Sequence, residues 1–387
     1  MADESKVLIE ATNLSKAYPA EAGGLLGIFG AGGEAIPALN GVSLTIGAGE
    51  SYGLTGESGS GKSALAKVLV GIEKADRGKV LFMGQYVTVE NRAKLRGQLR
   101  YISDDGLNSL NPSDPKNRLD NLLYGLSDKF AEGGNKNANR AWADELIRRV
   151  GLEQSDLKRF PHQISGGQRQ RFNIARALVI KPQLIICDEP VSNLDLQYRT
   201  DMLNLLKFIG RQNNTAFLFI SHNPSEVRYF VGTGRIGVMF AGRLMEEIPG
   251  RVLFDKAVHP YTKTLLAANE APTPVPASAF DAERVFAKTE REQFDAPDFQ
   301  TFESQASDLS ASGSVASLGQ LAAANKAGCP FYNWCPERFE RCTQETPKLL
   351  PVTHYRSQNG EDVPLPPAQI DDRHQAACFH YIDRTLS

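Results

Sequence analysis

The stretch SYGLTGESGSGKSALAKVLVG (51–71) decides the fold. Its central residues, GESGSGKS (56–63), fit the pattern G-x-x-x-x-G-K-[ST], with an apolar run before them and a helical pattern, 62–71, after them. In this strand–loop–helix order the pattern forms a phosphate-binding loop. Its glycines let backbone N–H groups surround a phosphate, and the helix start adds its dipole. The alternative is a Gly-rich turn that happens to contain a lysine.

The loop predicts nucleotide binding, and its side chains have distinct roles. Lys62 neutralises phosphate charge, and the Ser63 hydroxyl is a ligand for Mg²⁺. The loop residues expected to contact ATP are Gly56, Ser58, Gly59, Gly61, Lys62 and Ser63.

A second candidate group lies in QLIICDEP (183–190). The run is apolar up to Asp188, as expected of a parallel strand buried on both faces. Asp188, at the carboxyl end of the strand, can hold Mg²⁺ through water, and Glu189 can polarise the attacking water as a general base. Alone, this pair could equally cap a helix; the phosphate-binding loop favours the catalytic interpretation.

Residues 7–270 alternate short β-rich runs with helical patterns, which predicts an α/β layer architecture. The predicted strands are 42–46, 99–103, 183–188 and 215–221, and the predicted helices are 62–71, 140–150, 167–180 and 197–212.

Composition divides the chain into three expected parts. A nucleotide-binding domain covers 1–270, a linker or insertion rich in Ser, Ala and Gly covers 271–327, and a small cysteine-containing module covers 328–387. A Gly-rich segment, 21–36, lacks the Lys and Ser/Thr of a phosphate-binding loop, so we expect a surface hairpin or loop there.

Charge and hydropathy exclude several classes of function. The net charge of −2 gives no case for electrostatic nucleic-acid binding. No apolar stretch is long enough to cross a bilayer, and the acidic N-terminus is unlike a secretory signal. We therefore expect a cytoplasmic chain that reaches a membrane only through partners.

The segment ISGGQRQR (164–171) resembles the signature of the ABC (ATP-binding cassette) ATPase family, Leu-Ser-Gly-Gly-Gln, with Ile164 in place of Leu. Ser165 and two glycines begin a helix whose dipole can face a phosphate. Alone, the segment could be a capped helix with a Gly-Gly turn. The resemblance implies an ATPase with an ABC-type nucleotide-binding domain: a RecA-like core, an antiparallel β subdomain and a helical subdomain.

The resemblance also assigns roles to single residues. Tyr18, in NLSKAYP, takes the place of the aromatic residue that stacks on adenine. Asp195, in SNLD (192–195), belongs to the loop that crosses the dimer interface, with Asn193 where Ala is usual. His222 takes the place of the switch histidine that contacts the γ-phosphate; alone it would be interpreted as an ordinary surface or core residue.

In this family two subunits close face to face, and each ATP lies between the phosphate loop of one chain and the signature helix of the other. Ser165, Gly166, Gly167 and Gln168 would therefore contact the nucleotide held by the partner. A lone chain is expected to bind ATP but to hydrolyse it poorly.

One position departs from the family. Counting back from SLNP (109–112), the Q-loop glutamine falls on Asp104. A carboxylate can still bind Mg²⁺, but it adds negative charge near the phosphates and lacks the amide donor. The departure bears both on the full competence of the site and on its coupling to the membrane partner. Because Glu189 and His222 are present, we still expect hydrolysis.

Beyond these motifs the chain resembles the oligopeptide, dipeptide and nickel importers, over about 1–270 and 328–382. The marks are SLNP, HPYTKTLLAA (259–268) and the cysteine tail. The resemblance implies import of peptides or similar small solutes at the cytoplasmic face of the bacterial inner membrane. The implied partners are two permease subunits, a second and usually different ABC ATPase subunit, and an extracytoplasmic solute-binding protein.

Four of the five cysteines lie in the tail: Cys329, Cys335, Cys342 and Cys378. In a cytoplasmic chain such a group more often binds a metal than forms disulfides, and the spacings are unlike the short pairs of a zinc site. Some members of the resembling branch carry an iron–sulfur cluster in this extension, so a [4Fe–4S] cluster on these thiolates is expected. Zinc or four free thiols are the alternatives. Cys187, in an apolar run, is expected to be a buried free thiol.

Three other functions stay open. A soluble ABC ATPase of translation or DNA repair usually carries two cassettes or a coiled-coil insertion, and neither is visible. An exporter subunit is disfavoured by 259–268 and by the cysteine tail. A catalytically weakened regulatory cassette is supported by Asp104 alone.

Overall fold

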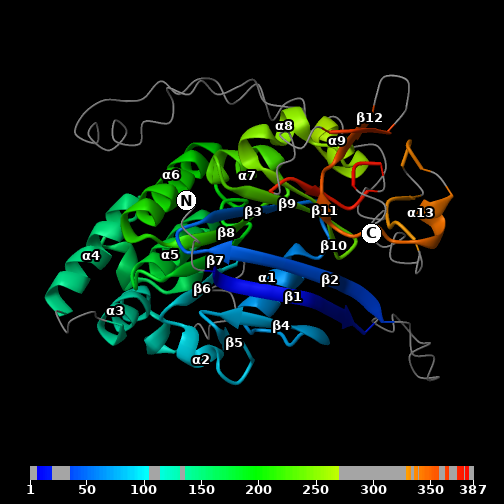
Figure 1. Cartoon of the computed structure of the whole chain (residues 1–387). Coiled ribbons are helices and arrows are strands. Elements are labelled where there is room, and N and C mark those ends of the chain that lie inside the picture. The colour runs from blue at the N-terminus through cyan, green and yellow to red at the C-terminus, as the bar shows by residue number, and fades with distance from the viewer. Residues whose placement is uncertain are drawn as a thin grey trace, which may run out of the picture. The chain divides into compact units, whose positions relative to one another are not determined.

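The computed structural model describes residues 7–19, 35–103, 114–130, 136–269, 328–332, 335–338, 340–356, 362–365, 373–378 and 380–382 (Figure 1). The chain divides into two compact units. The first holds Met1–Leu95, Leu218–Glu270 and Val315–Ser387, and the second holds Arg96–Phe217 and Ala271–Ser314. The phosphate loop and the cysteine tail therefore belong to the same unit.

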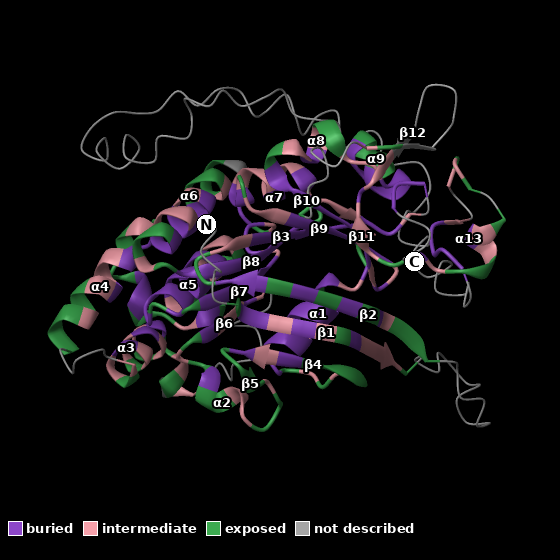
Figure 2. Ribbon diagram, viewed as in Figure 1, coloured by how far each residue is buried: buried purple, intermediate pink, exposed green. Residues whose placement is uncertain are grey.

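The first unit contains an antiparallel sheet with the strand order β2-β1-β4-β5. Its strands are β1 (Val7–Tyr18), β2 (Ile36–Gly47), β4 (Arg77–Phe82) and β5 (Gln85–Tyr86). Tyr18 lies opposite Ile36, so β1 and β2 form the arms of a hairpin around residues 20–34, which lie outside the described residues. Towards the end of β2, buried and exposed residues alternate, as expected of a sheet with one solvated face (Figure 2). This sheet is the expected antiparallel β subdomain.

Strands β11, β14, β10, β9 and β3 follow one another in a second sheet of the same unit. β3 (Ser51–Thr55) runs parallel to β9 (Arg235–Phe240), and β10 (Arg243–Pro249) returns antiparallel to β9. The helices of this part are α1 (Lys62–Leu69), α2 (Arg92–Leu95), α7 (Pro224–Val231), α8 (Leu253–Lys256) and α9 (Pro260–Ala268).

The C-terminal tail continues this second sheet. β14 (Gln375–Ala376) pairs antiparallel with β10, and β11 (Leu350–Pro351) pairs antiparallel with β14. A cluster of Val352, Ala376 and Tyr381 packs against Val258. The tail also contains a short helix, α13 (Arg341–Gln344), and a hairpin of β12 (His354–Arg356) and β13 (Asp362–Pro364).

The second unit surrounds two parallel strands with helices. β6 (Leu99–Ile102) pairs with β7 (Leu184–Asp188), whose five residues are all buried (Figure 2). The helices are α3 (Leu119–Lys129), α4 (Lys136–Arg149), α5 (Gly166–Leu178) and α6 (Leu196–Asn213). β8 (Ala216–Ile220) carries the chain from the second unit into the first.

The strands and helices predicted from sequence are confirmed within a few residues, with one larger difference. β2 begins at residue 36, whereas a strand was predicted over 42–46. Its first part pairs with β1, and cross-strand pairing of this kind leaves no signal in the local pattern. None of the described helices is long and apolar enough to cross a membrane.

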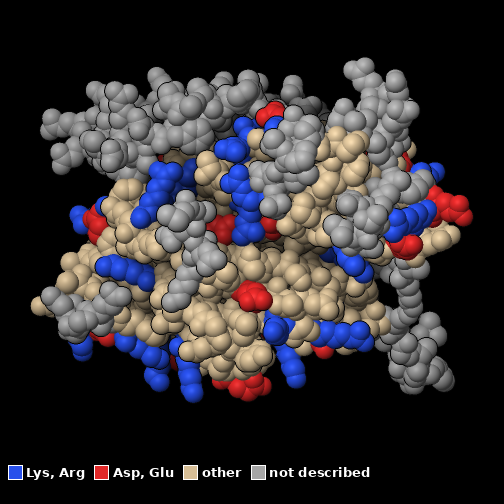
Figure 3. Space-filling view, in the orientation of Figure 1, with Lys and Arg blue, Asp and Glu red and all other residues tan. Residues whose placement is uncertain are grey.

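Charged side chains are mixed on the face seen in Figure 3. Among the residues described there, Lys and Arg form several separate groups with Asp and Glu between them. This agrees with the small net charge of the whole sequence.

Candidate active site

The phosphate loop of the first unit joins β3 to α1, and glycines shape both of its ends. Gly56 has a φ of +148° and Gly61 a φ of +104°, values that residues with side chains rarely adopt. A Cβ on Gly56 would lie 2.1 Å from the carbonyl oxygen of Met239, and one on Gly61 would lie 2.2 Å from that of Ala38. Between them Ser58 and Gly59 are exposed. The two ends of the loop therefore need glycine, while its middle faces open space.

Lys62 lies at the base of this loop and is 6% exposed. Its Nζ donates to the carbonyl oxygens of Gly56 and Glu57, both at 2.7 Å, and to Ser60 Oγ at 3.2 Å. These three partners are neutral, and they hold the ammonium against the loop. Ser63 follows on the first turn of α1 and is exposed. The loop thus has the cationic group and the hydroxyl that a nucleotide–Mg²⁺ site needs.

His222 lies at the same sheet edge as the phosphate loop, within the first unit. The backbone N–H of Ser221 donates to the carbonyl of Leu54 at 3.2 Å, two residues before the loop begins. The exposed His222 comes next, and Asn223 then caps α7 by accepting from the N–H groups of Ser225 and Glu226. The cap fixes the turn on which His222 is placed.

Tyr18 ends β1 in the first unit. Its hydroxyl donates to Glu73, and Lys16 Nζ lies 5.4 Å from the centre of its ring. Burial, followed by the hydrogen bond to Glu73, raises the pKa of Tyr18 above its usual value. The hydroxyl therefore stays neutral and ties the ring towards the end of α1, where Lys67 pairs with Glu73 at 3.6 Å.

Asp188 and Glu189 lie at the carboxyl end of β7 in the second unit. Asp188 is 7% exposed and accepts a hydrogen bond from Tyr101 Oη on the neighbouring β6, at 2.9 Å. Glu189 is half-buried and has a φ of +51°. A glutamate in this left-handed conformation costs free energy, and such strain concentrates at functional sites. The alternative, a helix cap formed by this pair, does not fit, because α6 begins only after Asp195.

The ISGGQ segment (164–168) begins α5 in the second unit. Ser165 Oγ accepts from the N–H of Gln168 at 3.2 Å, and Gln168 Oε1 accepts from the N–H of Ser165 at 2.9 Å. This reciprocal capping box satisfies two backbone donors of the helix start. The helix is thus capped, as expected of the alternative in which the segment is a capped helix with a Gly-Gly turn. The two glycines, however, lie in the first helical turn and not in a separate turn.

The residues after Glu189 are held by side chains of two helices. Gln170 on α5 donates to the carbonyl of Pro190 at 2.8 Å, and Arg199 on α6 donates from Nε to the carbonyl of Leu194 at 2.9 Å. Asn193 and Asp195 are both exposed. The SNLD segment is therefore a braced loop with two polar side chains directed to its surface.

The structure groups the expected site residues within the two units. The phosphate loop, His222 and Tyr18 belong to the first unit, and Asp188, Glu189, the ISGGQ segment and Asp195 belong to the second. Asp104 lies outside the described residues.

Comparison with known proteins gives consistent matches. The family described as "ABC transporter" matches residues 39–192. The oligopeptide transport ATP-binding protein OppF of Lactococcus lactis subsp. lactis (strain IL1403) is 41% identical over 248 residues, which cover 62% of this chain and 75% of that protein. The chain belongs to the ABC transporter family. It is an ATP-hydrolysing subunit of this family.

A second relative of the ABC chain extends beyond the nucleotide-binding region. The "Probable peptide ABC transporter ATP-binding protein y4tS" of Sinorhizobium fredii (strain NBRC 101917 / NGR234) is 34% identical over 356 residues, covering 91% of this chain and 89% of that protein. The dimeric structure of MJ0796, a bacterial ABC transporter cassette, has 27% identity and a TM-score of 0.53, covering 63% of this chain and 99% of that one. The expected ABC cassette fold is confirmed.

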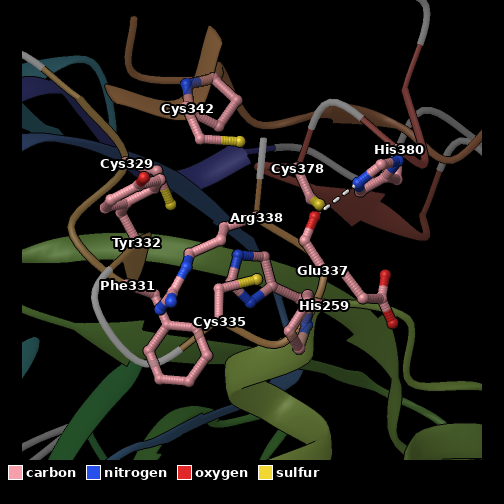
Figure 4. Close-up of a pocket in the computed structure, with 12 residues that line it drawn as sticks. His259, Cys329, Phe331, Tyr332, Cys335, Glu337, Arg338, Cys342, Cys378 and His380 are labelled. Atoms are coloured by element: carbon pink, nitrogen blue, oxygen red, sulfur yellow. Dashed lines mark hydrogen bonds between the residues drawn. The ribbon is translucent and has the colours of Figure 1, made fainter. Parts of the chain in front are cut away.

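The tail of the ABC chain brings its four cysteines to one pocket (Figure 4). Its other lining residues include His259, Pro260, Phe331 and His380. The five cysteines of the chain are free, and Cys187 is buried, as expected. In the part of the tail that is described Phe331 is buried, whereas Trp334 and Phe339 lie outside the described residues.

In this pocket Cys329 and Cys342 are buried, and Cys335 and Cys378 are half-buried. Burial raises the pKa of Cys329 to about 12, and burial also raises the pKa of Cys335 and Cys378. Neighbouring thiols add to each of these shifts, as expected of sulfurs that lie near one another. Across the described ranges, no three His, Cys, Asp or Glu side chains are arranged to hold a single metal ion.

Sequence reasoning missed three residues that act on the ABC site from outside its motifs: Tyr101, Gln170 and Tyr261. Tyr101 contacts Asp188 only because β6 and β7 are neighbours. Gln170 follows Gly166 by four residues, so helical spacing could have placed it beside the signature. Tyr261 reaches the phosphate loop from over 200 positions away, at the N–H of Glu57, and no local pattern indicates such a contact.

Proposed function

We propose that this chain energises the import of peptides, or of similar small solutes, across the bacterial inner membrane. The observation that supports it is the similarity to a peptide ABC transporter protein over 91% of the chain, which extends past the nucleotide-binding region into the tail. OppF of Lactococcus lactis adds a second relative named for oligopeptide transport. HPYTKTLLAA and the cysteine tail support the same branch.

In the proposed mechanism each motif acts on one part of ATP. Lys62 and the backbone of Gly56, Ser58, Gly59 and Gly61 hold the phosphates, and Tyr18 stacks on the adenine. Glu189 accepts a proton from the attacking water, and His222 contacts the γ-phosphate. The left-handed backbone of Glu189 supports its role, since backbone strain of this kind clusters at functional positions.

Mg²⁺, when bound, neutralises charge on the transferring phosphoryl group. The Ser63 hydroxyl and the Asp188 carboxylate are oxygen donors, which this ion prefers. Asp104 is the third ligand that we propose. Tyr101 orients Asp188 by donating a hydrogen bond to its Oδ2.

Gly166 and Gly167 support the inference that another cassette approaches this end of α5. Glycine in a helix is less favourable than alanine by about 1 kcal/mol, and the φ of these two residues is helical. Their backbone therefore has no need of glycine, whereas a close approach by a ligand does. We propose that Ser165, Gly166, Gly167 and Gln168 approach ATP bound to the partner cassette, with Asp195 crossing between the cassettes.

The proposed complex contains two membrane permeases, a second ABC ATPase subunit encoded by a different gene, and an extracytoplasmic solute-binding protein. The chain would lie at the cytoplasmic face of the inner membrane, bound to the permeases. Solute specificity would then belong to the permeases and the binding protein, because the motifs of this chain contact nucleotide.

We also propose that the four tail cysteines hold a [4Fe–4S] cluster. Four thiols lining one pocket are the donor set that such clusters use, and a cluster needs no single point at which three ligands meet. Burial raises the pKa of the Cys329, Cys335 and Cys378 thiols, so their ligation would release protons. The cluster would link the segments of the small cysteine-containing module through its iron–thiolate bonds.

The catalytic proposal is tested with Glu189→Gln in the purified complex. Without the carboxylate the water has no general base, so turnover should fall by at least about a hundredfold while ATP stays bound. Phosphate release and retained nucleotide are the two measurements, and Glu153→Gln in the same unit is the matched control. A Glu189→Gln complex that keeps more than a tenth of wild-type turnover contradicts the role.

The transport proposal is tested by purifying the tagged chain anaerobically from native membranes and identifying its companions by mass spectrometry. Two permeases, a second cassette and a solute-binding protein are expected. Recovery with ribosomes, or alone, contradicts the importer and favours a soluble ABC ATPase.

The same sample tests the cluster by iron and acid-labile sulfide analysis with visible absorption. About four irons per chain are expected, lost in Cys335→Ser and kept in Cys187→Ser. Zinc at one per chain, or no metal at all, contradicts the cluster.

A further inference from the structure

A tyrosine side chain of helix α9 contacts the phosphate loop. Tyr261 lies on α9 and is completely buried. Its Oη accepts a hydrogen bond from the backbone N–H of Glu57 at 3.0 Å. Glu57 is the second residue of the loop, directly after Gly56, and both residues belong to the same unit as Tyr261.

This hydrogen bond and one from Lys62 hold the same peptide group. The N–H of Glu57 and the carbonyl of Gly56 belong to one peptide unit, and in a trans peptide they point in opposite directions. Tyr261 holds the N–H, and Lys62 Nζ donates to the carbonyl at 2.7 Å. Rotation of this peptide would break both contacts together. The orientation of the peptide and the place of the Lys62 ammonium are therefore linked.

Gly56 itself does little to prevent that rotation. Gly56, with a φ of +148°, has no side chain to restrict its backbone. Restraint must come from neighbours, and Tyr261 supplies it on the N–H side. Burial and the nearby Glu57 raise the pKa of Tyr261, so its oxygen remains part of a neutral hydroxyl.

Aromatic residues from two parts of the first unit hold the Tyr261 ring. Phe240, at the end of β9, lies 4.5 Å away between ring centres, and Phe331 of the tail meets the ring edge-on at 5.5 Å. Phe331 also contacts Phe240 edge-on at 5.7 Å. It is 4% exposed, follows Cys329 by two residues, and lines the cysteine pocket (Figure 4).

We propose that Tyr261 is a positioning residue for the phosphate loop, and that the cysteine module sets ATP affinity through the Phe331–Tyr261 contact. Tyr261 fixes the Gly56–Glu57 peptide so that its carbonyl meets Lys62. Phe331 fixes the ring that carries the hydroxyl. This inference rests on the proposed nucleotide site.

The test compares Tyr261→Phe with a matched loss of a buried hydroxyl elsewhere. Tyr261→Phe keeps the ring and its contacts and removes only the oxygen. Tyr381→Phe is the control, because Tyr381 is 2% exposed and lies in the same unit. Its hydroxyl accepts from Lys263 at 3.1 Å and donates to Glu337 at 3.0 Å. The full chain is used, with equilibrium ATP affinity, thermal midpoint and hydrogen exchange at the Glu57 amide as measurements.

Tyr261→Phe should weaken ATP binding by about tenfold, because the half-buried N–H of Glu57 loses its acceptor and the peptide loses its orientation. The Glu57 amide should exchange faster. Phe331→Leu should weaken ATP binding by a smaller factor. Phe331→Tyr, which keeps the aromatic ring, should bind ATP as the wild type does. In the assembled complex the Tyr261→Phe change should appear in KM for ATP, with kcat retained, since the contact exists before and during the reaction.

Unchanged ATP affinity in Tyr261→Phe overturns the inference, as do equal losses in Tyr261→Phe and Tyr381→Phe, which would mean general destabilisation. An effect on kcat with KM unchanged would also contradict it. The Lys62→Ala variant distinguishes a failure of the Tyr261 inference from a failure of the proposed nucleotide site. If wild type fails to bind ATP, or Lys62→Ala binds as well as wild type, the nucleotide site fails; if both behave as expected, only the Tyr261 role is in question.

Discussion

Two glycine-rich helix starts, one in each unit, use glycine for different physical reasons. In the phosphate loop, Gly56 and Gly61 have positive φ, and a Cβ on either would meet backbone oxygen within 2.2 Å. At the start of α5, Gly166 and Gly167 have helical φ, and a Cβ would meet nothing closer than 3.7 Å. The first pair is required by the fold of the chain itself. The second pair is required by nothing among the residues that the structure describes.

The backbone around a glycine shows whether the fold of the chain or an approaching ligand requires it. Where the backbone demands glycine, substitution should damage the folded chain and its own nucleotide affinity together. Where the backbone does not, substitution should damage only what approaches from outside. Measurements on the isolated chain and on the assembled complex therefore separate the two.

The largest effect is expected for Gly56→Ala. The new methyl group would overlap the Met239 carbonyl, and the φ of +148° would be strained as well. We expect stability to fall by about 3 kcal/mol and ATP affinity of the isolated chain to fall at least about a hundredfold. Chemical denaturation and equilibrium nucleotide binding measure the two. A variant that binds ATP normally would show that the loop can refit, and the comparison would lose its first half.

Gly166→Ala should leave the isolated chain intact. Its Cβ would lie 4.0 Å from Arg169 and would favour the helix, so the thermal midpoint should stay equal or rise. The assembled complex should nevertheless lose ATPase activity by about tenfold or more, since the methyl group would displace the ATP held opposite. Lower stability without loss of activity would reverse the interpretation of this pair.

The smallest effect is expected for Ser165→Ala, which removes one side of the capping box. Stability should fall by about 1 kcal/mol, or about 2 °C in thermal midpoint for a chain of this size. Ser165→Asp is the control, because aspartate caps a helix equally well but brings negative charge towards a phosphate. We expect it to keep the stability and to lose the complex ATPase activity. Equal activity in Ser165→Asp and wild type would argue against a phosphate at this helix start.

Local motifs were the part of the site that sequence could predict. The phosphate loop is confirmed as a strand–loop–helix unit, and ISGGQ is confirmed as the start of a helix. Both depend on residues within about ten positions of one another, where spacing and φ preferences act directly. His222 could be placed only through its order in the series, and the structure shows it at the edge where β3 ends. The roles of these residues stay predictions.

Contacts between distant segments were the part that sequence could not predict. The hydrogen bond from Glu57 to Tyr261 spans 204 positions, and that from Tyr101 to Asp188 spans 87. Each depends on which strands and helices become neighbours, and a single sequence carries no local signal for that choice.

The sequence by itself determined the chemistry of this protein: an ATP-binding loop, two carboxylates at a strand end, a helix start that can face a phosphate, and four cysteines in the tail. These follow from residue types at short spacings, because phosphate and metal chemistry needs specific groups close together. The tertiary structure alone decided that β14 pairs with β10 and that Phe331 packs on Tyr261. Sheet pairing and burial join residues far apart in the chain, and in this way the tail comes to touch the residue that holds the phosphate loop.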